Sequence, residues 1–346
     1  MPVFNGGLQL SRCLEALCAS AYTNFEVMVV DDCSTDHTPQ IIQHYGAEYL
    51  RTPHKMGPGG ARNLGVEHAR GSIVVFVDAD VVLPPKALGL VAEDFERDPE
   101  LAAVFGSYDE EPAWKDFLSQ YKNLMHYYVH QTSSERAITF WAGCGAVRKD
   151  VFVLMGGFNT KKYAKPSIED IELGYRITEA GYRILLDKRL NCKHLKRWTW
   201  RVLLRADILY RAIPWTNLIL ETRNLPRDLN LTFASRLSGV LVWLLVLGVL
   251  AAPCSAAGWI AWLAPRALLA VLAGLVALLL ALNWDVYAFF KRKRGWWFAL
   301  RAIFAHWLYY LYGSAAFGLC VLVQGWRKFS AAVLGGMKMG PTELRQ

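Results

Sequence analysis

Residues 73–80 read IVVFVDAD, an apolar, β-branched run that ends in two carboxylates spaced two positions apart. The run predicts a buried strand, and alternate residues of an extended strand point to the same side. Asp78 and Asp80 are therefore expected to face one point just beyond the strand. In an open α/β sheet that point is the ligand crevice at the carboxyl ends of the strands. Paired hard oxygen donors at this point favour Mg²⁺ or Mn²⁺, with coordination positions left for phosphate oxygens.

The first 200 residues alternate strand-like and helix-like segments. Strands are predicted at 25–31, 47–51, 73–77, 102–106 and 182–187, and helices at 8–20, 37–45, 60–69 and 85–96. This alternation predicts an α/β fold with a doubly wound, mostly parallel sheet. The chain opens on MPVFN, which is typical of the end of a first strand. We expect the body of that strand to be absent, through either a late start codon or a truncation.

Long apolar runs replace the charged residues after about residue 230. They lie at 237–252, 267–290 and 303–324, and they are long enough for two or three membrane spans. The cluster Lys291–Arg294 lies between the second and third runs, so the positive-inside rule places it and the amino-terminal domain in the cytoplasm. A hairpin at Gly313–Ser314 would return the tail to the same side. The expected location is the inner, cytoplasmic membrane, with a multi-pass anchor.

A basic region precedes the apolar runs: eight Lys or Arg residues and one acid, Asp207, lie between Lys188 and Arg211. Its place ahead of membrane segments favours binding of anionic lipid headgroups, and no nucleic-acid partner is expected. The segment 198–220 mixes Trp, Leu and Ile with Arg, which predicts an amphipathic helix in the headgroup layer or, alternatively, a surface helix packed on the soluble domain. The predicted domains are 1–197 (catalytic), 198–232 (interfacial), 233–326 (transmembrane) and 327–346 (tail). Seven cysteines without CxxC spacing indicate reduced thiols.

Two motifs follow the first strands. In VVDDCSTD at 29–36, Asp31 and Asp32 can accept hydrogen bonds from a base or a ribose, while the residues after them can simply cap a helix. GPGGARN at 57–63 is a Gly-rich turn into a helix that carries Arg62. It fits neither the Walker nor the dinucleotide pattern, but a helix start beside an arginine suits an anion.

Two motifs lie nearer the basic region. Ser167 and Asp170 have the spacing of a capping box, whereas the functional alternative makes Asp170 a general base that deprotonates a hydroxyl. In HLKRW at 194–198, His194 can be a third metal ligand, Arg197 can neutralise a diphosphate, and Trp198 can stack on a sugar. The alternative is that these three residues only lie at a membrane interface.

Taken in order, the motifs resemble those of family 2 glycosyltransferases, the inverting enzymes of the GT-A fold. The resemblance runs from Met1 to about Trp198. Its motifs are PVFN at 2–5, VVDDCSTD at 29–36, GGARN at 59–63, DAD at 78–80, GCGAVR at 143–148, GGF at 156–158, the acidic pair at 169–170 and GY at 181–182. The HLKRW segment is similar to the QxxRW element of polysaccharide synthases, with His in place of Gln, and this departure argues against processive synthesis.

The resemblance implies a role for each matching residue. The catalytic base would be Asp170, with Glu169 beside it, and the acceptor side would include Trp141 and Gly143. The metal ligands would be Asp78, Asp80 and His194. The nucleotide-sugar site would contain Asn5, Asp31, Asp32, Gly60, Arg62, Asp78, Arg197 and Trp198.

The sequence thus predicts a membrane-anchored, inverting, Mg²⁺- or Mn²⁺-dependent glycosyltransferase. Its donor would be a nucleotide-diphospho-sugar, a UDP-sugar rather than a GDP-sugar, and its acceptor a lipid-linked or membrane-proximal group. The alternatives are a processive polysaccharide synthase and a non-catalytic membrane scaffold that binds sugar nucleotides. A nucleotidyltransferase is disfavoured because the chain start lacks a Gly-rich signature. The sequence specifies neither the donor sugar and acceptor nor the oligomeric state.

Overall fold

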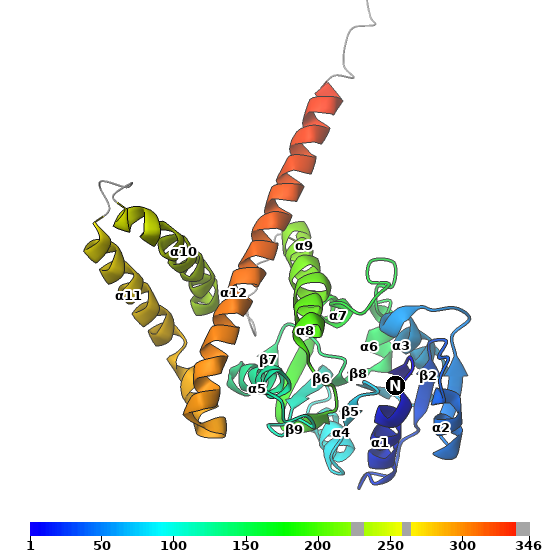
Figure 1. Cartoon of the computed structure of the whole chain (residues 1–346). Helices are drawn as coiled ribbons and strands as arrows, with labels where there is room; N and C mark the ends of the chain where they lie inside the picture. The colour runs from blue at the N-terminus through cyan, green and yellow to red at the C-terminus, as the bar shows by residue number, and fades with distance from the viewer. Residues whose placement is uncertain (223–231, 258–263, 337–346) are drawn as a thin grey trace, which may run out of the picture. The chain divides into compact units, whose positions relative to one another are not determined.

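The computed structural model describes residues 1–222, 232–257 and 264–336, which fall into two compact units (Figure 1). The first unit contains Met1–Leu203 and Trp284–Ala302. The second contains most of the apolar helices beyond residue 203. The first unit thus includes a segment, Trp284–Ala302, that lies far outside the predicted catalytic domain 1–197.

The first unit begins with a small parallel sheet of three strands in sequence order. These are β1 (Pro2–Val3), β2 (Met28–Asp31) and β3 (Glu48–Arg51), which alternate with helices α1 (Gly7–Cys18), α2 (Thr38–His44) and α3 (Gly57–His68). Apolar residues on the inner helix faces, such as Leu10 and Ile42, are fully buried with Val29 of β2. The predicted βα alternation of this region is confirmed.

The second sheet is mixed. It consists of β4 (Ile73–Val77), β5 (Val81–Val82), β6 (Leu101–Tyr108), β7 (Arg136–Ala137), β8 (Cys144–Arg148) and β9 (Arg183–His194), in the order β4-β8-β6-β9-β5 with β7 beside β9. Only β6 and β9 pair in parallel, while the β4–β8, β6–β8, β5–β9 and β7–β9 pairs are antiparallel. The expectation of a mostly parallel sheet is corrected here, because β8 enters between β4 and β6 and runs against both.

Four helices accompany the second sheet: α4 (Ala87–Arg97), α5 (Phe117–Thr132), α6 (Lys149–Leu154) and α7 (Glu169–Glu179). The sequence predicted α4 and α7 but not α5 or α6. A second buried cluster under this sheet contains Phe76, Phe105, Phe140 and Phe158. These rings lie at the centre of the sheet and hold β4, β6 and the loop before β8 together.

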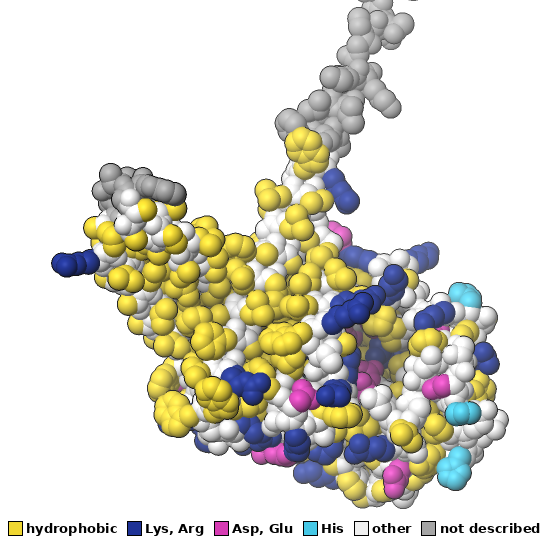
Figure 2. Space-filling view, in the orientation of Figure 1, with side chains coloured by type: hydrophobic (Ala, Val, Ile, Leu, Met, Phe, Trp, Pro, Cys, Tyr) yellow, Lys and Arg dark blue, Asp and Glu magenta, His cyan; other side chains and the backbone are white. Residues whose placement is uncertain are grey.

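The remaining helices are apolar or amphipathic. They are α8 (Trp200–Arg205), the π-helical turn η1 (Ala206–Ala212), α9 (Ile213–Thr222), α10 (Phe233–Ala256), α11 (Pro265–Leu282) and α12 (Trp284–Gly336). Three stretches are long and apolar enough to cross a membrane: Phe233–Ala256, Pro265–Leu282 and Trp284–Arg327. Hydrophobic side chains cover the visible faces of α10 and α11, whereas Lys and Arg gather on the amino-terminal unit (Figure 2).

Two details of the predicted spans are wrong. The proposed hairpin at Gly313–Ser314 is absent, because α12 continues through it and the Ser314 hydroxyl bonds back to the Tyr310 carbonyl. The break lies instead at Gly295, whose φ of 82° is outside the helical region. The predicted second run, 267–290, also ends early: α11 stops at Leu282, and the following residues belong to the first unit. Residues 223–231 and 337–346 of the predicted interfacial region and tail lie outside the described residues.

Candidate active site

Asp78 and Asp80 follow β4 and mark the centre of the candidate site. Their side chains are about one-third and one-quarter exposed, at 35% and 26%. The Asp78 backbone carbonyl accepts a hydrogen bond from the Val81 N–H, and the Asp80 carbonyl accepts one from the Leu195 N–H. A tight turn therefore presents both acids between β4 and β5.

Asp80 lies beside His194 at the end of β9, with 3.6 Å between Asp80 Oδ2 and His194 Nε2. Burial would raise the pKa of Asp80, but His194 and Lys196 outweigh burial and lower it.

A buried arginine connects two of the predicted acids. Arg62 of α3 donates from Nη2 to Oδ1 of Asp78 (2.6 Å) and from Nη1 to Oε1 of Glu169 (3.1 Å). Burial would lower the pKa of Arg62, but the charges of Asp78, Glu169 and Asp170 raise it. The guanidinium therefore remains charged and holds carboxylates of β4 and α7 on either side. Glu169 also accepts a hydrogen bond from the Ser167 backbone N–H, and its predicted place beside the catalytic base stays a prediction.

Asp170 is half-buried at the first turn of α7. Its Oδ2 accepts a hydrogen bond from the Ala142 N–H (3.0 Å), and its Oδ1 accepts one from the Ile171 N–H (2.8 Å). The predicted capping box is wrong, because the residue before the helix is Ile168 and no side chain caps it. Burial and the neighbouring Glu169 carboxylate raise the pKa of Asp170 to about 6. A carboxylate with this pKa can accept a proton near neutral pH.

The loop that precedes β8 joins the two halves of the site. Its Ala142 N–H bonds to Asp170, and the next residue, Gly143, accepts a hydrogen bond from the Asp78 N–H (3.2 Å). A Cβ at Gly143 would lie 2.5 Å from the Trp141 ring, so this position requires glycine. Trp141 and Gly143, predicted on the acceptor side, thus lie between the predicted base and the acidic pair.

The two acids predicted to bind the nucleotide, Asp31 and Asp32, accept hydrogen bonds from other groups of the protein. Asp31 is fully buried and accepts hydrogen bonds from the Ser34 N–H and the Tyr49 hydroxyl. Asp32 accepts the N–H groups of Met56 and Gly57 at the start of α3, so it orders the Gly-rich turn.

Two further residues of the predicted nucleotide site lie on the same turns. Asn5, with φ of 52°, bonds to the loop 34–35 through its backbone N–H and side-chain oxygen. Gly60 lies in the first turns of α3, where a Cβ would meet the Met56 side chain at 2.6 Å. The geometry therefore gives these four residues a part in ordering the turns after β1 and β2 and the start of α3, and their contact with a base stays a prediction.

The residues of the HLKRW segment at 194–198 lie in different surroundings. Arg197 is largely exposed, lies over the Trp114 ring and is 3.8 Å from the Asp116 carboxylate. Trp198 is buried, and its backbone N–H donates to the Ser119 hydroxyl. A buried ring offers little face to a sugar, and the predicted roles of Arg197 and Trp198 in donor binding stay predictions.

An aromatic cluster around His194 was missed at the sequence level. The Tyr108 ring stacks on His194, with centroids 4.1 Å apart and planes within 10°. Tyr108 also contacts His126 of α5 and Trp141. Tyr108 is the last residue of β6, and its position at the carboxyl end of a strand was the available signal. The cluster fixes the orientation of the imidazole that the sequence proposed as a metal ligand.

The carboxylates of Asp78 and Asp80 and the imidazole of His194 are chemical groups that can bind a divalent cation such as Mg²⁺ or Mn²⁺. Arg62 contacts Oδ1 of Asp78 and His194 contacts Oδ2 of Asp80, so each carboxylate keeps a second oxygen. Within the described ranges, no three His, Cys, Asp or Glu side chains already lie close enough together to enclose an ion. Metal binding by Asp78, Asp80 and His194 therefore remains a proposal.

Comparison with known families decides the class of the amino-terminal domain. Residues 1–154 match the family described as Glycosyl transferase family 2. We call the part of the first unit from Met1 to Leu203, which contains these residues, the family 2 domain. Among similar curated proteins, the glycosyltransferase YibD of Escherichia coli K12 is 35% identical over 107 residues, which are 30% of this chain and 31% of that protein. Chondroitin synthase of Escherichia coli is 33% identical over 109 residues, which are 30% of this chain and 16% of that protein.

A third relative is named by its reaction: the poly(ribitol-phosphate) β-N-acetylglucosaminyltransferase TarS of Staphylococcus aureus strain Mu50. It is 39% identical over 88 residues, which are 23% of this chain and 15% of that protein. The matched segments thus span about a third or less of these relatives' own lengths.

A solved structure matches nearly the whole chain. The mannosyltransferase PcManGT of Pyrobaculum calidifontis, solved with GDP-Man and Mn²⁺, aligns with a TM-score of 0.60 and 21% identity over 91% of this chain and 85% of that one. At this identity the likeness establishes the fold. The family 2 domain has a GT-A-type fold with a mixed sheet, and apolar helices follow it.

Proposed function

We propose that this protein is an inverting glycosyltransferase that moves a sugar from a nucleotide-diphosphate donor to a hydroxyl or phosphate acceptor at the membrane. The observation that carries the proposal is the pairing of two acids through one loop. Ala142 holds Asp170, whose pKa is raised to about 6, and the adjacent Gly143 holds the backbone of Asp78. The loop would thus hold the proposed base, Asp170, at a fixed distance from Asp78, the acid proposed to lie at the diphosphate.

In the proposed reaction, Asp170 accepts the proton of the acceptor hydroxyl as the acceptor oxygen attacks the anomeric carbon. The bond from that carbon to the diphosphate oxygen breaks on the opposite face, and the nucleoside diphosphate leaves with the electron pair. A single displacement needs no covalent sugar–enzyme intermediate, so one catalytic carboxylate suffices. Arg62 pairs with Glu169 beside Asp170, whereas Asp170 forms no ion pair with any residue that the structure describes.

Asp78, Asp80 and His194 would hold Mg²⁺ or Mn²⁺. A bound divalent ion supplies charge neutralisation for the leaving diphosphate. The fold neighbour PcManGT was solved with GDP-Man and Mn²⁺, which supports a sugar-nucleotide donor and metal use here. The fold neighbour PcManGT was solved with a GDP-sugar, whereas the sequence led us to expect a UDP-sugar, so the donor panel must include both.

The proposed topology places the family 2 domain on the cytoplasmic face of a membrane. The helices α10 and α11 would make two crossings, so the chain would return at Trp284 to the side on which it started. The contacts of Trp284–Ala302 with the first unit need this return. Lys291–Arg294 lies in this segment, and a short, positively charged connection between two membrane spans favours the cytoplasmic side. The last crossing would be the part of α12 after Ala302. A lipid-linked acceptor fits this placement.

The alternatives have less support. A processive polysaccharide synthase needs enough spans to line a channel, and the described residues contain three candidates. A non-catalytic scaffold has no need for a half-buried carboxylate with a raised pKa beside a buried arginine network.

The test is a panel of UDP- and GDP-sugars assayed for donor hydrolysis and transfer with Mn²⁺ in detergent. Asp80→Ala and Asp170→Asn are each expected to lower turnover by about a hundredfold or more, through lost charge stabilisation and lost base catalysis respectively. Asp98→Asn, which changes a surface carboxylate paired with Arg183, is the matched control and should keep wild-type turnover. Wild-type turnover in Asp170→Asn would contradict the base assignment.

A further inference from the structure

The segment Trp284–Ala302 has two different faces, and the inner one is fastened to the family 2 domain. Its Phe290 is fully buried against Tyr121 of α5, and Phe298 contacts Phe117 at the start of α5, with ring centroids 5.8 and 5.2 Å apart. Arg294 donates to the side-chain oxygen of Gln120 (2.6 Å) and to the backbone carbonyl of Glu110 (2.6 Å). These contacts make the segment part of the domain's own compact unit.

The outer face carries large aromatic and cationic side chains. Trp284, Trp296 and Trp297 are 63%, 69% and 71% exposed, and the Lys291 ammonium lies 3.8 Å from the centre of the Trp296 ring. Lys291 and Arg292 are exposed, and neither has a carboxylate partner among the described residues. Three exposed tryptophans on one short segment are uncommon on a protein surface that faces water alone. Tryptophan and cationic side chains together are typical of the membrane–water interface.

Chain connectivity restricts where this outer face can lie. The candidate span α11 ends at Leu282, and only Asn283 separates it from Trp284. Its 18 residues are about 27 Å long, close to the thickness of the hydrocarbon core. The rest of α12 begins directly at Ile303 and stays apolar to Arg327. If both helices cross the bilayer, the segment between them has no linker with which to leave its surface.

From these observations we propose that Trp284–Ala302 is a membrane clip: its inner face binds α5, and its outer face inserts Trp296 and Trp297 into a headgroup layer that contains anionic phospholipid. Lys291 and Arg292 would attract the anionic headgroups. The clip would hold the α5 side of the domain against the membrane. This inference depends on the membrane spans and not on the sugar-transfer reaction, so it can fail while the proposed function stands.

The test uses the full chain in lipid nanodiscs of phosphatidylcholine with phosphatidylglycerol, with or without bromine on the acyl carbons nearest the headgroups. Bromine quenches tryptophan fluorescence on contact. We expect the bromine-dependent loss of fluorescence to be smaller in Trp296→Phe/Trp297→Phe than in the wild type. Trp114→Phe, which removes an exposed indole bonded to the Leu195 carbonyl, is the matched control and should leave the loss unchanged.

A second variant removes the two positive charges and keeps both tryptophans, whose fluorescence is measured. Lys291→Gln/Arg292→Gln should lower the bromine-dependent loss in phosphatidylglycerol nanodiscs to the level found in phosphatidylcholine alone. Acrylamide, a water-soluble quencher, separates the other outcomes. Tryptophans 296 and 297 that are quenched by acrylamide and not by bromine lie in water, which overturns the proposal. If neither agent reaches them, a second copy of the chain covers them, and this result also overturns the proposal.

Discussion

At the scale of single residues, the proposed reaction depends on an Asp170 carboxylate that can accept a proton near neutral pH. Asp170 and Glu169 are neighbours in sequence, yet the fold gives them different partners. Glu169 pairs with the buried Arg62, whereas Asp170 receives only backbone N–H groups. The division explains why burial and the Glu169 charge raise the pKa of Asp170 to about 6. In the proposed reaction these two adjacent acids would have separate roles: Glu169 would position the network and Asp170 would accept the proton.

This division predicts the pH dependence of transfer. The proposed base acts in its ionised form, so kcat/KM should rise with pH up to about 6 and then level off. Glu169→Gln removes the negative charge that raises the pKa of Asp170 and leaves Arg62 beside it, so the rising limb should move to lower pH. The measurement is a pH–rate profile of both proteins. A Glu169→Gln variant that loses activity without a shift of the limb would make Glu169 the base instead.

The loop that contacts both acids gives a second prediction. Gly143→Ala would place a Cβ 2.5 Å from the Trp141 ring and displace the Ala142 N–H from Asp170. We expect kcat to fall about ten- to a hundredfold, because small misplacements of reacting groups are costly. Gly89→Ala in α4, where a Cβ meets no atom within 4 Å, should keep its activity. Equal kcat values for the two variants would contradict the role of the loop.

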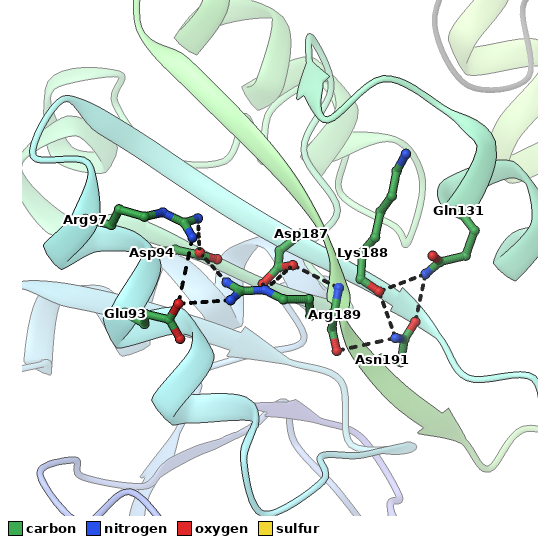
Figure 3. Close-up of polar contacts among 8 residues, drawn as sticks. All are labelled: Glu93, Asp94, Arg97, Gln131, Asp187, Lys188, Arg189 and Asn191. Atoms are coloured by element: carbon green, nitrogen blue, oxygen red, sulfur yellow. Dashed lines mark hydrogen bonds and ion pairs between the residues drawn. The ribbon is translucent and has the colours of Figure 1, made fainter.

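At the scale of elements, a polar network fastens α4 to β9 (Figure 3). Arg189 donates to Asp187, Glu93 and Asp94, and Arg97 also bonds to Asp94. The Asp94 side chain has no exposed surface, and burial together with the Asp187 charge raises its pKa to about 6. The arginine thus compensates carboxylates that would otherwise be costly to bury. Because β9 ends at His194, this network also supports the candidate site.

Removing that arginine should destabilise the domain. Arg189→Gln leaves Asp94 and Asp187 without their shared cation, and we expect the free energy of unfolding to fall by about 2 kcal/mol. Arg97→Gln removes a more exposed partner of the same carboxylate and should cost less. Chemical denaturation monitored by fluorescence measures both values. A larger loss in Arg97→Gln would show that Arg189 is not the main support of the network.

The elements also show what the sequence could predict. Segments with a clear apolar period, such as 73–77 and 85–96, formed the predicted strand and helix. β8 reads CGAVR, and its Gly and Ala residues carry little strand signal, although they fit beside Phe140 and Trp141. The acids at 78 and 80 could be located from strand periodicity. The Arg62–Glu169 pair and the stacking of Tyr108 on His194 could not, because their members lie more than 80 positions apart.

At the scale of the whole molecule, hydropathy located the apolar helices but not their division between the units. The run 267–290 looks continuous in sequence, yet its last residues, including Phe289 and Phe290, are buried on α5. An apolar residue facing lipid and one facing a protein domain have the same hydropathy, so periodicity alone could not separate them. The incorrect hairpin at Gly313–Ser314 has a different origin: it came from the expectation that the tail returns to the side of Lys291–Arg294.

The resulting topology is testable. With three crossings, positions after Arg327 should lie on the opposite side of the membrane from Lys291–Arg294 and the family 2 domain. Reporter enzymes fused directly after Arg327 and, in a separate fusion, directly after Arg294 measure the two sides in intact cells. The same side for both fusions would require a further or a missing crossing.

The central claim is that Asp170 performs chemistry at a site where other residues bind the donor. The most direct measurement compares donor affinity and single-turnover transfer in Asp170→Asn with Mn²⁺ present. The account predicts donor affinity within about twofold of the wild type and a transfer rate lower by about a hundredfold or more. Transfer at the wild-type rate, or loss of donor binding in place of transfer, would contradict it.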